Sequence, residues 1–248
     1  MSRRKLLLTD NKYSRGVVAV CAGSKKYPGA ALLAVGGART GGAGYVKFLS
    51  SSRELSLLVV ANYPDVVPIT SLDDERFDSL LIGPGASSLA KIPIVPLVLD
   101  SAAIASVTKK GFRNLQRTTV ITPHEGELRY LGGRYKNVLE VSNRIGMAKE
   151  IARELRVIVV LKGRGTVIAA PDGRTFIDEL GGPELATAGS GDLLAGLIAS
   201  LLVRIKDGDD AFDLVCAAVD LHSKAGRNAA KQFTSVTALE ILEALHHV

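Results

Sequence analysis

The chain has 248 residues, and 47% of them are hydrophobic, which is enough to build one α/β domain with a sizeable core. Its 31 basic and 25 acidic residues give a formal net charge of +6, which suits an anionic ligand. The basic residues are scattered and only 5% of residues are aromatic, so nucleic-acid binding is disfavoured, since such surfaces combine basic with stacking side chains. The longest apolar run, Leu193 to Val203, is shorter than the roughly 20 residues that cross a bilayer, so no membrane span is expected.

Two cysteines occur, Cys21 in an apolar run typical of a strand and Cys216 in a helical stretch. Neither lies in a pattern typical of a disulfide framework or a metal site. We therefore expect two reduced thiols and a cytoplasmic protein.

Short β-branched runs, glycine-containing turns and helical patterns alternate along the chain, which is typical of parallel strands joined by crossover helices. A hairpin is expected around Pro171-Asp172-Gly173, whose residues favour a tight turn. The sheet is therefore predicted to be parallel first and to gain antiparallel strands late. The expected strands are Val17 to Cys21, Tyr45 to Leu49, Leu57 to Ala61, Ser79 to Ile82, Leu97 to Asp100, Thr119 to Ile121, Val157 to Leu161, Thr166 to Ala170 and Arg174 to Ile177.

Helical patterns are clearest toward the C-terminus. Between Leu193 and Ile205, apolar residues recur every three or four positions, as on a helix with one buried face. A second helix is expected from Ala211 to Lys231, and a third after Thr237, which forms a capping-box pattern with Glu240. No repeat or Pro/Ser-rich linker interrupts the chain, so we predict a single domain over residues 1–248.

The segment Gly189-Ser190-Gly191-Asp192 opens the first of these helices. Its two glycines let the backbone turn sharply and approach a ligand, because no Cβ blocks the way. The free N–H groups and the positive dipole end of a helix start favour phosphate oxygens. Phosphate binding does not explain Asp192, because like charges repel. This residue is either a base that takes a proton from a hydroxyl reacting with a phosphoryl group, or simply a helix cap, a common role for aspartate.

Further polar and glycine-rich segments follow other predicted strands. Because the carboxyl ends of parallel strands share one edge, Gly85, Asp100, His124, Lys162 and Asp192 can converge there. The segment Lys162-Gly163-Arg164-Gly165-Thr166 suits a backbone that lies along a nucleotide, although an ordinary hairpin loop remains an alternative. Neither a Gly-x-x-x-x-Gly-Lys-Ser/Thr phosphate loop nor a Gly-x-Gly-x-x-Gly dinucleotide fingerprint occurs.

These motifs together resemble those of the ADP/ATP-dependent NAD(P)H-hydrate dehydratases, a family of ribokinase-like enzymes. The resemblance covers nearly the whole chain, and its marks stand in family order. They are Lys12-Tyr13-Ser14-Arg15-Gly16, Gly23-Ser24 with Tyr27-Pro28-Gly29-Ala30-Ala31, Gly42-Ala43-Gly44, Gly83-Pro84-Gly85, Leu99-Asp100, Thr122-Pro123-His124 with Gly126-Glu127, Lys162-Gly163, and Ala186 to Gly196.

The resemblance implies a ribokinase-like three-layer α/β/α sandwich with a mostly parallel central sheet and late antiparallel strands. It also implies repair of the S-epimer of hydrated NADH or NADPH, which carries a hydroxyl at C6 of the nicotinamide ring. In that reaction the terminal phosphate of ADP or ATP moves to this hydroxyl and is then eliminated, which restores the reduced cofactor. Mg²⁺ is expected to neutralise the phosphates, although no metal cage can be identified in the sequence.

The resemblance assigns roles to individual residues. Asp192 would be the catalytic base, and the backbone of Gly189, Ser190 and Gly191 would hold the transferring phosphate. The nucleotide would lie against Lys162, Gly163, Arg164, Gly165, Thr166 and Gly191. The hydrated dinucleotide would lie against Ala43, Gly85, His124 and Asp192.

Two positions depart from the family pattern. Ala102 stands where the family usually has a second aspartate after Asp100, which puts an aspartate-dependent contact to water or metal in doubt. Ala86-Ser87 replaces the usual Leu-Gly after Gly85, so contacts to the dinucleotide can differ. The chain has no room for the epimerase domain that some relatives carry, so a separate epimerase is the expected functional partner. A homo-oligomer, a tetramer, is the expected assembly.

Two rival functions remain. A ribokinase-like kinase of a vitamin precursor or sugar would use Asp192 in the same way but release a phosphorylated product; the His124 motif and Tyr27-Pro28-Gly29 argue against it. A non-enzymatic nucleic-acid-binding protein would leave Asp192 and the strand-end glycines unexplained. The sequence leaves open the choice between ADP and ATP and between the NADH and NADPH hydrates.

Overall fold

A computed structural model of the chain describes residues 6–85, 93–106, 118–132 and 143–248. The strands are β1 (Val17–Cys21), β2 (Tyr45–Leu49), β3 (Val67–Ile69), β4 (Ser79–Ile82), β5 (Leu97–Leu99), β6 (Thr119–Ile121), β7 (Ile158–Leu161), β8 (Thr166–Ala169) and β9 (Thr175–Asp178). The α-helices are α1 (Pro28–Thr40), α2 (Arg53–Asn62), α3 (Ala102–Ser106), α5 (Glu125–Gly132), α7 (Arg144–Leu155), α8 (Ser190–Leu202), α9 (Ala211–Gln232) and α10 (Ala238–Ala244). Short 3₁₀ helices cover Pro183–Leu185, Val203–Asp207 and Leu245–His247.

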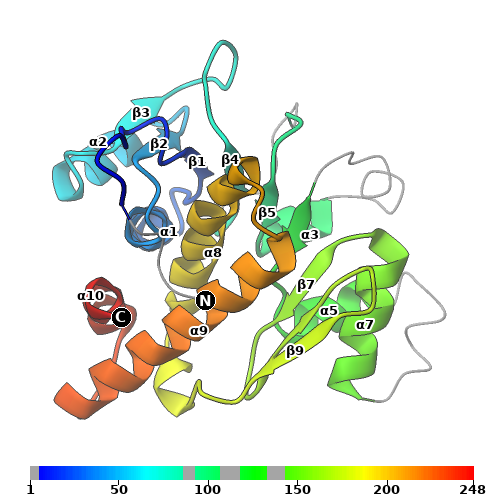
Figure 1. The fold of residues 1–248 in the computed structure, drawn as a ribbon. Coiled ribbons are helices and arrows are strands. Elements are labelled where there is room, and N and C mark those ends of the chain that lie inside the picture. Colours follow the sequence, from blue (N-terminus) through cyan, green and yellow to red (C-terminus); the bar gives the residue numbers. More distant parts are fainter. Residues whose placement is uncertain (1–5, 86–92, 107–117, 133–142) are drawn as a thin grey trace.

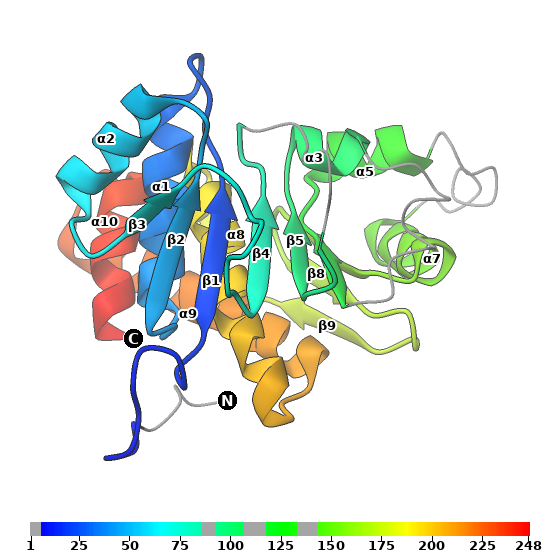
Figure 2. The same cartoon turned by 90° about the horizontal axis from the view of Figure 1, so that it is seen from above.

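The strands form a nine-stranded sheet in the order β3-β2-β1-β4-β5-β6-β7-β8-β9. The pairs from β3 to β7 are all parallel, and β8 and β9 join antiparallel as a hairpin. Figure 2 shows β3, β2, β1, β4 and β5 side by side in this order, with α1 and α8 behind them. The prediction of a parallel sheet that gains antiparallel strands late is confirmed.

Side chains alternate between the two faces of the sheet, as strand geometry requires. Val18 and Val20 of β1 belong to one apolar cluster, which is completed by α1, α2, α8, α9 and α10. Ala19, between them, belongs to a second cluster with α3, α5 and α7. The two helical layers are visible on opposite sides of the sheet (Figures 1 and 2). The architecture is therefore a three-layer α/β/α sandwich with a core on each face.

Helices α1 and α8 cross in direct backbone contact. A Cβ on Gly37 would lie 2.1 Å from the carbonyl oxygen of Leu193, and a Cβ on Gly196 would lie 2.0 Å from that of Ala34. Both positions therefore require glycine, because even an alanine would have no space. This close packing fixes the position of the first turn of α8 relative to the loop after β1.

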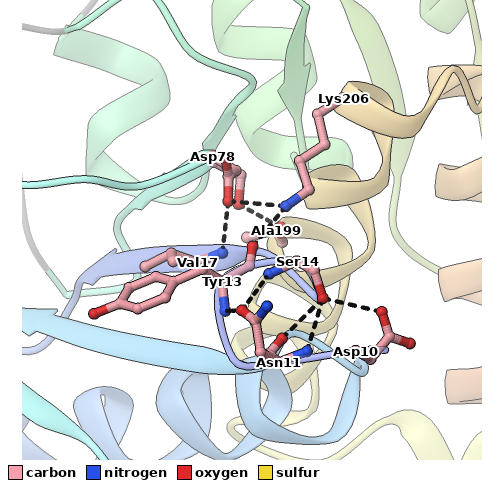
Figure 3. Close-up of polar contacts among 9 residues, drawn as sticks. Asp10, Asn11, Tyr13, Ser14, Val17, Asp78, Ala199 and Lys206 are labelled. Atoms are coloured by element: carbon pink, nitrogen blue, oxygen red, sulfur yellow. Dashed lines mark hydrogen bonds and ion pairs between the residues drawn. The ribbon is translucent and has the colours of Figure 1, made fainter. Parts of the chain in front are cut away.

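The segment before β1 is anchored at the edge of the sheet where the parallel strands begin (Figure 3). Asp78 accepts a hydrogen bond from the backbone N–H of Val17 at 2.8 Å. It also forms an ion pair with Lys206, whose Nζ lies 3.5 Å from its Oδ2. Lys206 also donates to the carbonyl oxygen of Tyr13 at 2.9 Å. This network joins the N-terminal segment to the end of the α8 region, far along the chain.

One prediction of secondary structure is corrected, and one strand was missed. Leu57 to Ala61, expected as a strand, lies inside α2, because Ser52 caps that helix and only Leu55 and Val59, one turn apart, are buried. A short apolar run does not by itself distinguish a strand from a helix. The edge strand β3 was not predicted, since it has three residues and includes Pro68, which sheets tolerate at an edge.

One predicted helix start agrees with the structure. The capping box of Thr237 and Glu240 is present at the start of α10. Cys21 and Cys216 are both free thiols, and burial raises the pKa of Cys21 to about 11. Among the described residues, no helix is both long and apolar enough to cross a membrane.

Candidate active site

The turn before α8 has the geometry of an anion site. Gly189 adopts φ +88°, and a Cβ there would lie 2.2 Å from Cδ1 of Leu33, so both the conformation and the space require glycine. Helix α8 begins at Ser190, and the N–H groups of Gly191 and Asp192 lie in its first turn, ahead of any intrahelical acceptor. These groups and the positive end of the helix dipole favour an anion at this turn.

Asp192 is the third residue of α8 and does not cap it. The cap position is Gly189, which offers no side chain, and no side-chain hydrogen bond closes this end of the helix. Burial and, to a smaller extent, the nearby Asp100 carboxylate raise the pKa of Asp192 to about 7, against the opposing charge of Lys162. A carboxyl group with this pKa takes up and releases protons near neutral pH, as a general base must. The geometry therefore favours a base over a cap.

Lys162 and Asp100 form an ion pair beside the turn. Lys162 follows β7 and Asp100 follows β5, and their Nζ and Oδ1 atoms are 2.8 Å apart. The Asp100 side chain is only 1% exposed and also accepts hydrogen bonds from Thr122 at 2.5 Å and Ser101 at 2.7 Å. A Cβ on Gly191 would lie 3.2 Å from the Lys162 ammonium, so this cation reaches the first turn of α8.

A cavity of about 990 Å³ opens from this turn between the loop after β7, strand β9, α8 and α9. All five residues of the Lys162 to Thr166 segment line it, together with Ser190 and Gly191. Another part of its wall is formed by Arg227 and by Gly181, Gly182, Pro183, Leu185 and Ala186. The predicted nucleotide-binding residues are thus brought together around one space of suitable size for a drug-sized or nucleotide-sized ligand.

A second hollow, of about 260 Å³, is lined by His124 and by Ser101, the residue after Asp100. The His124 side chain is 61% exposed, and its Nδ1 accepts a hydrogen bond from the backbone N–H of Glu127 at 3.2 Å. Lys162 donates its backbone N–H to Pro123, which joins the loop before α5 to the loop after β7. His124 therefore lies at the same edge of the sheet as Asp100 and Lys162.

The turn after β4 lies against the same cluster. A Cβ on Gly83 would lie 2.2 Å from the carbonyl oxygen of Asp100, and a Cβ on Gly85 would lie 3.2 Å from Cα of Gly23. Gly23 also donates its N–H to Pro84 at 2.7 Å. Gly85 thus joins the strand-end edge as predicted, whereas the divergent Ala86-Ser87 pair lies outside the described residues.

Ala43 is not brought to this cluster. It precedes β2, and its N–H donates to Oγ of Ser200, eight residues beyond Asp192 on α8. At about 1.5 Å of rise per helical residue, the contact on α8 lies roughly 12 Å from the first turn. The assignment of Ala43 to the dinucleotide therefore rests on the family resemblance alone.

Among the described residues, no group of three His, Cys, Asp or Glu side chains forms a metal cage. Mg²⁺ typically keeps several waters and binds phosphate oxygens with one or two carboxylates. Asp100 is already occupied by Lys162, Thr122 and Ser101. The site around Asp100 therefore fits a magnesium ion that is held mainly by the phosphates of a nucleotide.

Comparison of the chain with known protein families identifies its family. A family model described as NAD(P)H-hydrate dehydratase matches residues 18–247. The chain belongs to the NAD(P)H-hydrate dehydratase family. It is 32% identical over 249 residues to a bifunctional NAD(P)H-hydrate repair enzyme of Gloeobacter violaceus, in a match that covers 91% of this chain and 47% of that protein. The chain thus spans about half the length of that relative.

A second relative in the family is an ADP-dependent (S)-NAD(P)H-hydrate dehydratase of Xanthomonas campestris, 31% identical over 249 residues, with 91% of this chain and 84% of that protein covered. Among solved structures, the chain is similar to the ADP/ATP-dependent NAD(P)H-hydrate dehydratase of Bacillus subtilis co-crystallised with ATP and Mg²⁺. The TM-score is 0.85 at 27% identity, over 98% of this chain and 92% of that one. A ribokinase of Thermotoga maritima matches with a TM-score of 0.56 at 15% identity over 94% of this chain and all of that one, so the fold is ribokinase-like.

The structure adds two residues to this family site that sequence reasoning missed. Arg144, at the start of α7, donates to the carbonyl oxygens of Lys162 at 3.2 Å and of Arg164, and so stabilises the loop between β7 and β8. His222, in the middle of α9, lies against Ser190. A lone arginine after Asn143 carries no signal in the sequence, whereas a single histidine among the apolar residues of α9 could have been noticed.

Proposed function

We propose that this protein dehydrates the S-epimer of hydrated NADH or NADPH back to the reduced cofactor, with ADP or ATP as phosphoryl donor. Such a reaction makes it a lyase of the hydro-lyase class. The observation that carries the proposal is Asp192, a carboxyl group with a pKa of about 7 in the first turn of α8, beside an anion site and a cavity of nucleotide size. Family membership and the names of the relatives support the substrate class.

The proposed chemistry has two stages. Asp192 removes the proton of the C6 hydroxyl, and the hydroxyl oxygen forms a bond to the terminal phosphorus of the nucleotide while the bond to the bridging oxygen breaks. The products of this stage are a phosphate ester and a nucleotide shortened by one phosphate. The ester then loses phosphate, which takes the electrons of the C6–O bond, and a proton leaves the neighbouring ring carbon. The ring double bond of the reduced cofactor is thereby restored.

The chain's own residues would bind and orient the reactants. Residues 162–166 and Gly191 would hold the nucleotide in the large cavity, with Arg144 stabilising the loop behind it. The backbone of the Gly189 to Gly191 turn would hold the transferring phosphate, where preorganised N–H donors stabilise developing charge. Gly85 and the exposed ring of His124 would contact the dinucleotide, as would Ala43 on the family resemblance. A bound Mg²⁺ supplies charge neutralisation on the phosphates.

Several finer points belong to the same proposal. An epimerase that supplies the S-epimer would be the functional partner. The two free cysteines support a reducing compartment, and the cytoplasm is the one we propose. A homo-oligomer, with a tetramer as the specific expectation, completes the proposal.

The proposal is tested by incubating the purified protein with an epimer mixture of hydrated NADH, then of hydrated NADPH, with Mg²⁺ and either ADP or ATP. We expect recovery of the near-ultraviolet absorbance of the reduced nicotinamide, and we expect the S-epimer alone to be consumed. No recovery with either donor would exclude the dehydratase. A stable phosphorylated vitamin precursor or sugar, made in its place, would favour the small-molecule kinase.

A further inference from the structure

A buried histidine is hydrogen-bonded to Ser190, the first residue of α8. Nε2 of His222 lies 3.1 Å from Oγ of Ser190. Both residues are buried, with 4% and 3% of their surface exposed, and both line the 990 Å³ cavity. The contact joins α9 to the start of α8, 32 residues earlier in the chain. The dehydration chemistry described above makes no use of this pair.

The protonation state of His222 limits what the pair can do. Burial lowers the pKa of His222 to about 4, against the opposing effects of a backbone hydrogen bond to Ser190 and the charge of Asp178. At neutral pH the ring is therefore uncharged and carries a single N–H. Because Nε2 faces the Ser190 hydroxyl, this nitrogen either donates to the oxygen or accepts its hydrogen.

The two arrangements have opposite consequences for an anion. If Nε2 accepts the hydroxyl hydrogen, Ser190 presents only lone pairs to the cavity and repels phosphate oxygens. If Nε2–H donates, it occupies one lone pair of Ser190 and leaves the hydroxyl hydrogen available to a ligand. The distance between Nε2 and Oγ fits both arrangements, and only the second suits an anion at this turn, where the start of α8 favours one.

We propose that His222 is a positioning residue that donates Nε2–H to Ser190 and thereby makes the Ser190 hydroxyl a fixed donor to a phosphate group of the bound nucleotide. This inference rests on the proposed function, because it requires a nucleotide phosphate at the turn before α8. It assigns to a residue of α9, which lies behind the turn, a part in binding the nucleoside diphosphate or triphosphate.

The next residue of α9 supports another wall of the same cavity. Ser223 donates to Oδ2 of the buried Asp178 at 2.6 Å, and that oxygen also accepts the backbone N–H of Gly181 at 3.2 Å. Gly181 lines the cavity. Two adjacent side chains of α9, His222 and Ser223, therefore support two different walls of the nucleotide cavity. A substitution at His222 is accordingly expected to change ligand binding in that cavity.

The test is a double-mutant cycle on the binding of ADP with Mg²⁺, measured by calorimetry. Ser190→Ala and His222→Leu should each weaken ADP binding about tenfold, the scale of one charge-assisted hydrogen bond, and the double variant should be no weaker than Ser190→Ala alone. His222→Gln should stay within about threefold of the wild type, because its amide N–H can take the place of Nε2–H. Ser79→Ala, which removes another buried serine hydrogen bond to α8, at Ala199, should leave ADP binding unchanged and controls for loss of stability.

The possible outcomes separate this inference from the proposed function. Additive effects of the two substitutions, or the same loss in Ser79→Ala, would overturn the role of His222 while ADP binding by the wild type stands. Failure of the wild type to bind ADP or ATP would overturn both. Nitrogen NMR of the His222 ring gives an independent check, with the Nε2–H tautomer expected and the Nδ1–H tautomer contradicting the inference.

Discussion

Asp192→Asn is expected to lower the turnover of hydrated NADH by about 10² to 10⁴-fold, the usual contribution of a general base. Asparagine keeps the size of the side chain but cannot accept the proton of the C6 hydroxyl. Because no side-chain hydrogen bond closes the start of α8, the substitution removes no cap. Steady-state rates measured alongside ADP affinity distinguish a lost base from a damaged nucleotide site, since ADP affinity should change little.

The pH dependence of the wild type gives a second readout of the same residue. The base must be ionised, and burial has raised the pKa of Asp192 to about 7, so kcat/KM should rise with pH through this value. The acidic limb should be absent from the residual activity of Asp192→Asn. An Asp192→Asn enzyme with near-normal rates would show that Asp192 is not the base.

The stability of the same variant follows from linkage. The folded state binds the Asp192 proton more tightly than the unfolded chain, whose carboxyl titrates near the ordinary value of 3.8. Ionised Asp192 therefore destabilises the wild type as pH rises above the ordinary value and up to about 7, and the cost persists above that pH. Asp192→Asn should have the higher Tm at about pH 8, and the difference should vanish only below the ordinary value of 3.8, where both states are protonated.

Lys162→Met is expected to have the largest effect on stability, on the order of 3 kcal/mol, because it leaves the Asp100 carboxylate buried without its cation. The side chain of Asp100 is 1% exposed and that of Lys162 is 21% exposed. Activity should fall as well, because the ammonium borders the phosphate turn. Loss of Lys162 should also raise the pKa of Asp192 further and move the acidic limb of the pH profile upward. Chemical denaturation and a pH–rate profile measure the two effects.

A matched double variant separates these contributions. Adding Asp100→Asn to Lys162→Met removes the unpaired charge, so much of the lost stability should return. It also removes the carboxylate that raises the pKa of Asp192, so the acidic limb of the pH–rate profile should move back to lower pH. Activity should stay low, because the proposed nucleotide site still lacks Lys162. If Lys162→Met unfolded at the same denaturant concentration as the wild type, the ion pair would contribute nothing to the fold.

Much of the fold could be predicted from local sequence patterns. Continuous apolar runs identified most of the parallel strands, and the capping box at Thr237 placed the start of α10. The failures have physical causes. The apolar residues from Leu57 to Ala61 have no strand alternation, and the signal that decides for a helix is the cap at Ser52, outside the run. Strand β3 exists because β2 offers it an edge, which no local pattern reveals.

The candidate site was predictable where it depends on the shared edge of a parallel sheet. That rule correctly brought together Asp100 and Lys162, which are 62 residues apart, and placed Gly85 and His124 nearby. It could not identify partners that approach from a helix layer, such as His222 behind Ser190 or Arg144 behind the Lys162 loop. It also gave no warning that Ala43 lies near the other end of α8.

In the proposed reaction, phosphate transfer from a nucleotide is coupled to recovery of the reduced cofactor. This coupling is tested most directly by measuring inorganic phosphate and nicotinamide absorbance together during turnover of hydrated NADH by the wild type. We predict one phosphate released for each reduced cofactor formed, and neither product without ADP or ATP. Recovery of absorbance without nucleotide, or use of the nucleotide without any gain in absorbance, would contradict the account.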